Sequence, residues 1–323
     1  EQAQKIPPET GIYPIIRMPN GELKPLDIKR LETITQEACR NLSEVDADFI
    51  IKDALRNLYH EASFEDVQKA LIMAARTMVE REPNYSYASA RLLLDSLRSE
   101  ALIKLNLCQE ATFDEMAKLY SQYFFVYIEK GIQQGILDAK LAEFDLQKLG
   151  KALLPERDMQ FTYLSLQTLY DRYFIHDHNV RYELPQAFFM RVAMGLAIRE
   201  SDKNQKAIEF YLQLSSFDYM SSTPTLFNSG TVRPQLSSCY LTTIPDDLKG
   251  IYSAISDNAL LSKYAGGLGN DWTQVRAIGS HIKGTNGLSS GVVPFLNVAN
   301  ATAIAVNQGG KRKRAVCAYL ECW

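Results

Sequence analysis

The stretch Arg233-Pro-Gln-Leu-Ser-Ser-Cys239-Tyr-Leu241 sets a thiol at the start of a predicted β-strand, beside two hydroxyl side chains and behind a turn that contains proline. Cys239 has two interpretations. It is a redox-active group if it is accessible in a polar setting, because thiols react as thiolates. It is an inert packing group if the strand is buried. The stretch alone leaves both interpretations open.

The sequence around this stretch is typical of an α/β region. After Met220, short runs of strand-forming residues alternate with one helical segment and with loops rich in Gly, Ser and Asn. The predicted strands are 238–243 and 315–320, the predicted helix is 248–264, and the predicted loops are 265–270, 283–291 and 307–310. We therefore expect residues 221–323 to form one α/β part of the chain.

Upstream of Met220, apolar residues recur with helical spacing. Residues 106–220 contain three segments with an apolar stripe and a charged opposite face, at 113–130, 161–172 and 185–198. Residues 13–29 predict a hairpin that turns at Pro19-Asn20-Gly21. Ser63 and Asp66 fit a capping box ahead of a helix that continues to Met78. Residues 1–105 thus read as a hairpin-plus-helices module, and residues 106–220 as a helical region.

Composition excludes several classes of protein. The 323-residue chain has a formal net charge of −3 and a pI near 5.9, so no overall positive field favours nucleic acid or an anionic membrane surface. No apolar run reaches the roughly 18 to 20 residues needed to cross a bilayer. Five scattered cysteines do not make a disulfide scaffold, and we expect a cytoplasmic protein. Cys39 and Cys108, set among helical apolar residues, are predicted to be packing groups.

Three further motifs have more than one interpretation. Gly266-Gly267-Leu268-Gly269 follows a helix rather than a strand, so we predict a plain loop whose amides can approach a phosphate, not a dinucleotide fingerprint. His176-Asp177-His178 lacks a third ligand and predicts an exposed turn rather than a metal site. Gly309-Gly310-Lys311-Arg312 is either a solvated turn or, as its mobile amides and cations favour, a site for a nucleotide-sized anion.

Seven ordered stretches between residues 157 and 323 resemble the large, catalytic subunit of class I ribonucleotide reductases. They are Arg157-Asp-Met-Gln-Phe-Thr-Tyr163, Ser222-Thr-Pro-Thr-Leu-Phe-Asn-Ser-Gly230, Arg233-Pro-Gln-Leu-Ser-Ser-Cys239, Ala265-Gly-Gly-Leu-Gly269, Arg276-Ala-Ile-Gly-Ser280, Gly284-Thr-Asn-Gly287 and Asn307-Gln-Gly-Gly310. Residues 13–105 are more weakly similar to the ATP-cone of that family. The resemblance implies a mixed α/β chain: an ATP-cone-like module and a helical layer, followed by the first half of a ten-stranded α/β barrel.

The resemblance also implies an activity, the reduction of ribonucleoside diphosphates to deoxyribonucleoside diphosphates by radical chemistry. In that family, the cysteine at the position of Cys239 pairs with a later cysteine, and the dithiol supplies two electrons as it closes to a disulfide. Other positions match residues that hold or line the substrate: Thr223, Ser238, Gly266, Gly267, Gln308 and Arg312. The loop 307–314 would lie between an allosteric effector and the substrate base.

A second group of positions matches the specificity site of the family, where a deoxynucleoside triphosphate or ATP binds at a dimer interface. Its members are Asp246, Leu248, Lys263, Arg276, Ile282, Lys283 and Asn307. Their chemistry suits that role, since a carboxylate can bind ribose hydroxyls, cations can bind phosphates and aliphatic side chains can flank a base. The spacing to Gly250 favours Asp246 over Asp247 at the ribose, although either carboxylate fits.

The resemblance implies no prosthetic group on this chain, but Mg-bound dNTP or ATP effectors and a radical from the metallocofactor of a small subunit. The implied partners are that small subunit, a second large subunit, thioredoxin or glutaredoxin as reductant, and the C-terminal half of the large subunit as a separate chain. The radical cysteine of the family and the redox partner of Cys239 would lie beyond Trp323. We therefore expect a split or truncated large subunit that is inactive and prone to aggregation by itself.

The ATP-cone-like module departs from its family pattern. A Lys-Arg-Asp-Gly turn is usual there, and this chain has Arg17-Met-Pro-Asn-Gly21, while Ser63, Gln68 and Arg98 do not supply the expected phosphate and base contacts. We expect a degenerate cone that serves packing. Two rival hypotheses for the whole chain are a non-catalytic regulatory subunit that keeps the effector site, and an α/β interaction protein with a solvated basic loop.

Overall fold

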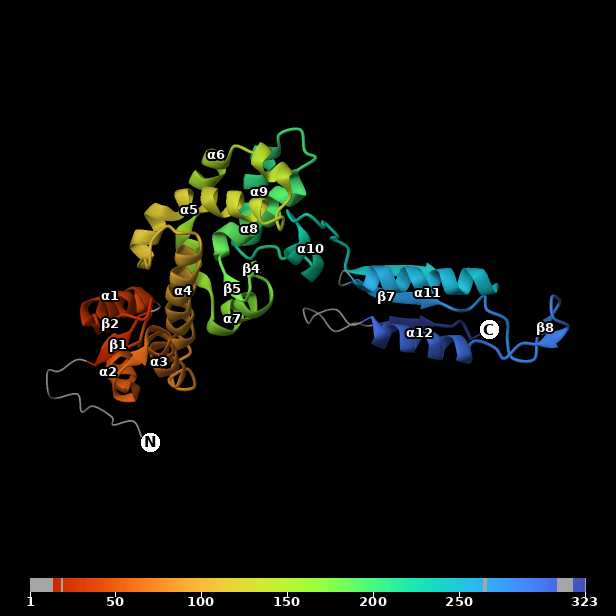
Figure 1. Cartoon of the computed structure of the whole chain (residues 1–323), viewed down its shortest axis with the longest axis horizontal. Coiled ribbons are helices and arrows are strands. Elements are labelled where there is room, and N and C mark those ends of the chain that lie inside the picture. The colour runs from red at the N-terminus through yellow and green to blue at the C-terminus, as the bar shows by residue number, and fades with distance from the viewer. Residues whose placement is uncertain (1–13, 19, 264–265, 307–315, 323) are drawn as a thin grey trace. The chain divides into compact units, whose positions relative to one another are not determined.

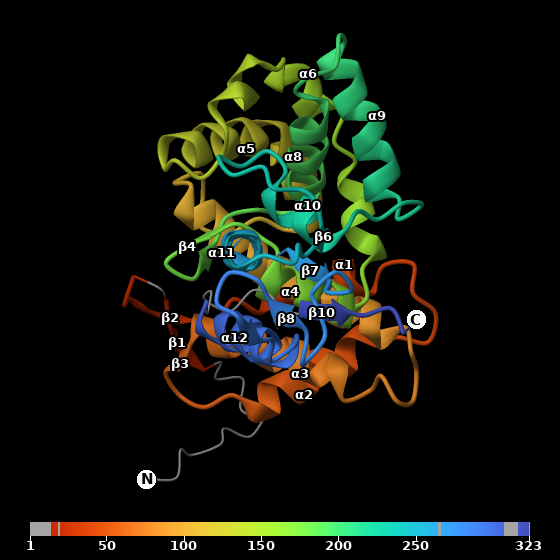
Figure 2. The ribbon, with the colours of Figure 1, turned by 90° about the vertical axis from the view of Figure 1, so that its right-hand side faces the viewer.

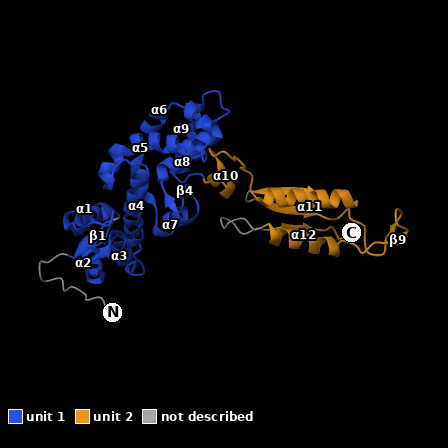
Figure 3. Cartoon of the chain, viewed as in Figure 1, with its two compact units in different colours: residues 1–219 blue, residues 220–323 orange. Residues whose placement is uncertain are grey.

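The chain forms two compact units, residues 1–219 and 220–323, which we call unit 1 and unit 2 (Figure 1, Figure 3). The computed structural model describes residues 14–18, 20–263, 266–306 and 316–322. Helices and strands occur in both units, which confirms the mixed α/β fold class. Within these ranges, no helix is long and apolar enough to cross a membrane.

Unit 1 begins with a small sheet in the order β2-β1-β3 and four helices. The elements are β1 (Ile15–Arg17), β2 (Leu23–Pro25), α1 (Ile28–Cys39), α2 (Ala47–Asn57), β3 (Ala62–Ser63), α3 (Phe64–Arg76) and α4 (Tyr85–Lys104). β1 and β2 pair antiparallel, which confirms the predicted hairpin, although its turn residue Pro19 lies outside the described residues. Ser63 and Asp66 form the predicted capping box at the start of α3.

The rest of unit 1 is helical. Its elements are α5 (Phe113–Gln133), η1 (Ala139–Glu143), α6 (Leu146–Lys151), η2 (Pro155–Gln160), α7 (Tyr163–Arg172), the hairpin β4 (His176–Asp177) and β5 (Val180–Arg181), α8 (Pro185–Ala197) and α9 (Lys203–Ser215). The predicted helices 113–130, 161–172 and 185–198 are confirmed as α5, α7 and α8. α4 packs on α1 and α3 and also on α7 and β5, so one helix belongs to both halves of the unit.

Unit 2 contains a parallel sheet in the order β10-β7-β6 with two helices on one of its faces. Its elements are α10 (Thr223–Asn228), β6 (Cys239–Thr243), α11 (Leu248–Lys263), β7 (Gly267–Asp271), the hairpin β8 (His281–Ile282) and β9 (Gly287–Leu288), α12 (Val293–Ala305) and β10 (Val316–Tyr319). Figure 2 views α11 and α12 nearly along their axes, on the same side of the strands. The predicted strands 238–243 and 315–320 and the predicted helix 248–264 are confirmed.

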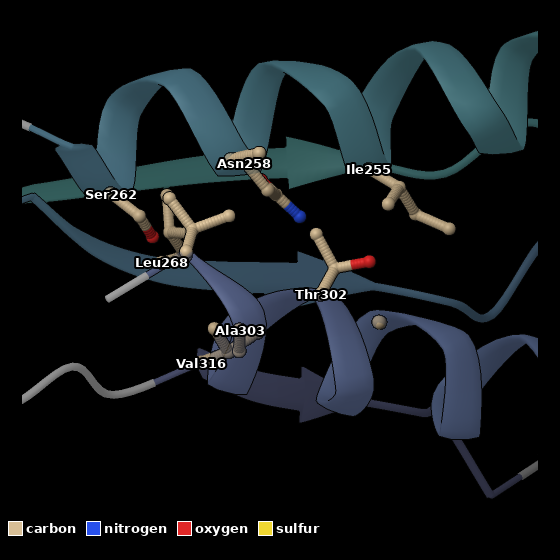
Figure 4. Close-up of a pocket in the computed structure, with 10 residues that line it drawn as sticks. Ile255, Asn258, Ser262, Leu268, Thr302, Ala303 and Val316 are labelled. Atoms are coloured by element: carbon tan, nitrogen blue, oxygen red, sulfur yellow. The ribbon is translucent and has the colours of Figure 1, made fainter. Parts of the chain in front are cut away.

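The helix-covered face of this sheet carries the core of unit 2. Ile251 and Ile255 of α11 and Trp272 after β7 are buried together, and Phe295 and Leu296 of α12 pack on them. Figure 4 looks into the space between the two helices and the strands, where Asn258, Ser262 and Thr302 surround a cavity of about 10 Å³, which suffices for one water at most. The opposite face of the sheet has no helix on it among the described residues.

Two expectations about unit 2 are wrong. The segment 265–270 was expected to be a loop, but Gly267–Asp271 is β7, the central strand. Glycine is depleted in strands because it loses more backbone entropy on folding and has no side chain to pack. The glycine-rich sequence therefore does not predict a strand, although β7 is stabilised by pairing with a strand on each side. α12 was not expected at all, because Val293–Ala305 lacks a charged face and therefore shows no helical period. No closed barrel occurs in the described part, and the open parallel sheet agrees with an incomplete barrel.

Candidate functional site

The thiol of Cys239 lies at the first position of β6 and is exposed. The carbonyl of Ser238 accepts a hydrogen bond of 2.7 Å from the Gly267 amide, which starts the pairing of β6 with β7. A Cβ at Gly267 would lie 3.5 Å from the Cys239 sulfur and 3.3 Å from the Ser238 oxygen. The expected redox thiol, Ser238, Gly266 and Gly267 are therefore adjacent, and Cys239 is exposed in this chain.

The segment that leads to this thiol is held by α10. The Thr225 hydroxyl donates to the carbonyl of Leu236 at 3.1 Å, and the Asn228 amide donates to the carbonyl of Gln235 at 2.7 Å. Thr223, the first residue of α10, is thus on the element that positions the approach to Cys239. The other expected substrate residues, Gln308 and Arg312, lie outside the described residues, as does Asn307.

Two of the expected effector residues, Asp246 and Arg276, are bound to each other. The Asp246 carboxylate accepts from the Arg276 backbone amide at 3.0 Å and from its Nε at 3.0 and 2.9 Å. Both side chains are about one-third exposed, at 34% and 35%, so a ligand can reach them. The pair brings a carboxylate and a guanidinium together from positions 30 residues apart.

The neighbouring carboxylate has a different task. Asp247 Oδ1 accepts from the Gly250 amide at 2.8 Å and so caps the start of α11. This leaves Asp246 as the carboxylate that faces Arg276 and solvent, which favours the choice of Asp246 over Asp247 at a ribose. The choice itself stays a prediction.

The remaining effector residues are spread over unit 2. Leu248 is the first residue of α11 and is 65% exposed. Lys263 is the last residue of the same helix and lies about 22 Å away along the helix axis. Ile282 belongs to β8, and Lys283 follows that strand. The backbone carbonyl of His281, the other residue of β8, accepts a hydrogen bond of 3.4 Å from Arg276. The described chain gathers Asp246, Leu248 and Arg276 near one end of α11 and does not bring Lys263 to them.

Unit 1 has its own cavities, beneath the hairpin of the ATP-cone-like module. One of about 500 Å³ is lined by Arg17, Ser63, Gln68, Glu100 and Arg181, among others, and two smaller ones adjoin the same hairpin. Ser63 is engaged in the capping box, and Gln68 accepts a hydrogen bond of 3.1 Å from Ser96. Arg98 is buried and donates to Asp95 and to the carbonyl of Ala111. Ser63 and Arg98 thus stabilise the module, whereas Gln68 lines the cavity and its Nε2 is buried without a partner.

The charged side chains around these cavities are engaged with other side chains. All four lining cations in the described part already have anionic or aromatic partners: Arg17 with Glu61, Lys24 with Glu22, Arg30 with Asp95 and Glu110, and Arg181 stacked on Tyr170. Burial raises the pKa of Glu100, and it raises the pKa of Glu110 although Arg30 pairs with that carboxyl. Phosphate groups are bound by cations and N–H donors, so a nucleotide in these cavities would compete with the present partners for the four cations.

Other predicted groups fall outside any site. Cys39 is mostly buried, and burial raises the pKa of its thiol to about 11, as expected for a packing group. The same expectation is wrong for Cys108, which is exposed in the turn after α4. His176 and Asp177 form β4, and Asp177 binds Lys104 at 2.7 Å and His178 at 2.7 Å. Among the described residues, no three His, Cys, Asp or Glu side chains group as metal ligands.

Comparison with protein-family models gives three consecutive matches. The model of the ribonucleotide reductase barrel domain matches residues 237–323, that of the ribonucleotide reductase all-alpha domain matches 159–234, and that of the ATP cone domain matches 14–100. The chain belongs to the ribonucleotide reductase large-subunit family. Cys239, Asp246 and Arg276 all lie in the part that matches the reductase barrel, and the cavities of unit 1 adjoin the part that matches the cone.

Curated reductase subunits agree with this assignment. The chain is 51% identical over 287 residues to the ribonucleoside-diphosphate reductase subunit alpha of Chlamydia muridarum, which covers 88% of this chain and 27% of that protein. It is 48% identical to the subunit alpha of Chlamydia pneumoniae over 98% of this chain and 30% of that protein. It is 42% identical to the subunit alpha of Helicobacter pylori over 94% of this chain and 37% of that protein. The chain thus spans about a third or less of the length of most reductase subunits it matches here.

Sequence reasoning missed two residues beside the thiol. Cys317 and Tyr319 of β10 are both exposed and belong to the same sheet as Cys239. Their spacing of two in a predicted strand indicates that they share a face. The order β10-β7-β6, which brings that face beside Cys239, has no signature in the sequence.

Proposed function

We propose that this chain is the part of a ribonucleoside-diphosphate reductase large subunit that supplies a redox thiol, a substrate-phosphate pocket and an effector site. The observation that carries the proposal is the exposed Cys239 at the start of a parallel strand, opposite Gly267, in a chain that belongs to the reductase family. Exposure on a sheet face without a helix is what a thiol needs to exchange electrons with a substrate and a reductant.

The proposed chemistry balances as a dithiol reduction. A ribonucleoside diphosphate and two thiols give a deoxyribonucleoside diphosphate, water and one disulfide, so Cys239 and a second cysteine each lose a hydrogen atom. The second cysteine and the radical that starts the reaction are not supplied by the described residues. We infer that they come from the remainder of the large subunit, on the same or a separate chain, and from a small subunit, and that a thioredoxin-like or glutaredoxin-like dithiol restores Cys239.

Substrate contacts are proposed for the elements around the thiol. Thr223 at the start of α10, Ser238 before β6 and the Gly266-Gly267 backbone are the groups on this part of unit 2 that can bind a diphosphate through hydroxyls and amides. Gln308 and Arg312 are proposed to contact substrate from the loop 307–314. Arg312→Ala should weaken the coupling between effector and substrate while the affinity for effector alone stays nearly unchanged, and unaltered coupling would exclude the loop from this role.

The effector site is proposed at the Asp246–Arg276 pair. A nucleoside triphosphate supplies ribose hydroxyls for the carboxylate and phosphates for Arg276, with Leu248 and Ile282 as apolar neighbours and with Lys263, Lys283 and Asn307 as further contacts. Because Lys263 lies at the far end of α11, the complete site would form in a dimer.

The ATP-cone-like module is proposed to serve packing rather than nucleotide binding. Calorimetry with dATP on the full chain tests this against the effector site: wild type should bind through the Asp246–Arg276 site, and Arg276→Ala should bind at least tenfold more weakly or not at all. Saturable binding that survives Arg276→Ala and is lost in Gln68→Ala or Arg17→Ala would contradict the degenerate-cone hypothesis.

The test of the main proposal is Cys239→Ser in the assembled enzyme. Turnover driven by a dithiol reductant should fall to background, because serine cannot form a disulfide, whereas dATP binding should remain within about twofold. Cys108→Ser, which removes an exposed thiol in unit 1, is the matched control and should keep wild-type turnover.

A non-catalytic regulatory subunit is the alternative function, favoured only by the intact Asp246–Arg276 pair. It predicts that Cys239→Ser changes neither turnover of the assembly nor effector binding. An interaction protein without nucleotide sites would show no thermal shift with any nucleotide.

A further inference from the structure

In the sheet of unit 2, the face on which no helix lies among the described residues carries two thiols and a phenol. They surround two glycines of β7, Gly267 and Gly269, which we call the glycine strip. In the register of the sheet, Gly267 is the partner of Cys239, and Gly269 is the partner of both Leu241 and Cys317. Positions two apart on a strand share a face, so Cys239, Leu241, Cys317 and Tyr319 all project on the same side as the two glycines. On this face, the side chains of β6 and β10 are therefore separated only by the backbone of Gly267 and Gly269 in β7.

Side chains from both outer strands lean over this glycine strip. A Cβ at Gly267 would lie 3.5 Å from the Cys239 sulfur, and a Cβ at Gly269 would lie 2.9 Å from Cε2 of Tyr319. The sulfur thus lies over one glycine and the tyrosine ring over the next glycine on the same face, about 7 Å further along β7 at the usual rise per residue. Any larger residue at either position would separate the two groups.

The Tyr319 hydroxyl is oriented within this face. Its hydrogen bond with Cys317 is the main cause that raises the pKa of Tyr319 above its usual value. A tyrosine that stays protonated is a hydrogen-bond donor throughout the physiological range. Cys317 fixes the ring from its own strand, while Cys239 lies on the other side of the strip.

Cys317 is not placed to be the disulfide partner of Cys239. The two residues are on the outer strands of the sheet, so their backbones are separated by two strand spacings, about 9.5 Å. A disulfide requires Cα atoms within about 7 Å. Cys317 therefore remains a thiol while Cys239 changes its redox state, and its role on this face is to hold Tyr319.

We propose that Tyr319 is a positioning residue for the redox thiol: its hydroxyl turns from Cys317 across the glycine strip and donates its single proton to the sulfur of Cys239 when that sulfur is a thiolate. The proposal rests on the redox function proposed for Cys239. When an external dithiol reduces the disulfide of Cys239, the attacking thiolate breaks the S–S bond and one sulfur departs with the electron pair. A donor beside the departing sulfur stabilises the thiolate until it takes up a proton.

The test measures the thiolate directly and needs no turnover. The full chain is alkylated with iodoacetamide between pH 6 and 10, and the rate at Cys239 is followed by mass spectrometry of its peptide. Tyr319→Phe should move the midpoint of this profile to higher pH and slow alkylation at pH 7.5 about three- to tenfold, because less of the thiol is present as the reactive thiolate. Tyr252→Phe, which removes an exposed hydroxyl from α11, should leave the profile unchanged.

Two further measurements keep the outcome specific. Cys317→Ala should reproduce part of the Tyr319→Phe effect, because the hydroxyl loses the partner that orients it, and Cys317→Ser should retain more of the wild-type rate. The rate at Cys108, an exposed thiol in unit 1, reports changes of reagent or conditions and should be the same in all variants. An unchanged Cys239 profile in Tyr319→Phe, or an equal change at Cys108, overturns the proposal. Failure of the redox function would appear separately, as turnover that survives Cys239→Ser.

Discussion

Polar chemistry is arranged in opposite ways in the two units. In unit 1 the Glu183–Arg191 ion pair is fully buried, with Nε and Oε1 2.7 Å apart, and Asp158 is buried between Tyr120 and Gln186. In unit 2 the thiols are exposed, and glycine replaces the side chains between them. The Glu183–Arg191 charges of unit 1 are thus paired and buried, whereas the thiols of unit 2 are exposed.

This difference separates stability from function. A buried charge costs free energy unless its partners compensate the loss of water, so removing one member of the Glu183–Arg191 pair should destabilise unit 1. An exposed thiol or guanidinium contributes little to folding and is available for chemistry. Substitutions in unit 1 should therefore change stability, and substitutions on the glycine strip should change reactivity.

The chain offers separate signals for the two units. Both of its tryptophans, Trp272 and Trp323, are in unit 2, so tryptophan fluorescence follows that unit, while far-UV circular dichroism is dominated by the helices of unit 1. The predictions that follow use both signals.

The largest expected effect is that of Arg191→Met. The substitution keeps the bulk of the side chain but leaves the Glu183 carboxylate buried without its cation, which should lower the free energy of unfolding of unit 1 by about 3 to 5 kcal/mol. Urea unfolding followed by circular dichroism measures the change. Arg199→Met, at an exposed position just after α8, is the control and should stay within about 0.5 kcal/mol of wild type. Equal effects of the two variants would contradict the claim that buried pairs stabilise unit 1.

The second effect depends on pH and on Asp158. Burial raises the pKa of this carboxyl to about 6, above its ordinary value near 3.8, so the folded state holds a proton that the unfolded state releases between these pH values. The stabilisation is complete below about pH 3.8 and is lost as the pH rises through 6, a change of up to about 3 kcal/mol. Asp158→Asn mimics the protonated acid, so the difference in unfolding free energy between variant and wild type should grow from pH 4.5 to 7.5. A difference independent of pH would show that the carboxyl titrates normally.

The smallest effect on stability is expected in unit 2, for Gly269→Ala. The added Cβ would lie 2.7 Å from Leu241 and 2.9 Å from Tyr319, but both neighbours are exposed side chains that can move, so the cost should be about 1 kcal/mol or less. The same variant should change the alkylation rate of Cys317 at least twofold, because the ring that holds this thiol is displaced. Gly284→Ala, which meets no atom within 4 Å, should change neither quantity. If Gly269→Ala strongly lowered the stability measured by fluorescence and left the thiol reactivity unchanged, the claim that this strip affects reactivity rather than stability would be wrong.

Local chemistry made much of the fold predictable. The Pro19-Asn20-Gly21 turn, the Ser63 capping box and the apolar stripes of unit 1 each depend on residues close in sequence, and the hairpin and the helices follow from them. β7 could not be predicted because its glycines carry no pattern, and α12 because it is apolar on all sides. Both elements depend on neighbours that are distant along the chain.

The candidate site shows the same limit. The residue types Cys239, Asp246 and Arg276 indicated their chemistry, but the direct bond between Asp246 and Arg276 depends on how two loops fold back toward each other. The approach of Tyr319 to the thiol face depends on the order of strands in the sheet. The sequence therefore indicates which side chains can react or bind, but which of them lie together depends on the topology of the fold.

The helix shared by both halves of unit 1 has a consequence for how this protein can change over evolutionary time. α4 is buried along most of its length, by α1 and α3 toward the module and by α7 and β5 toward the helical region. Deleting or exchanging the module at residue 105 would strip apolar surface from the region that remains. A substitution of one side chain that lines the cavities of the module would leave this packing intact, whereas loss of the whole module would not.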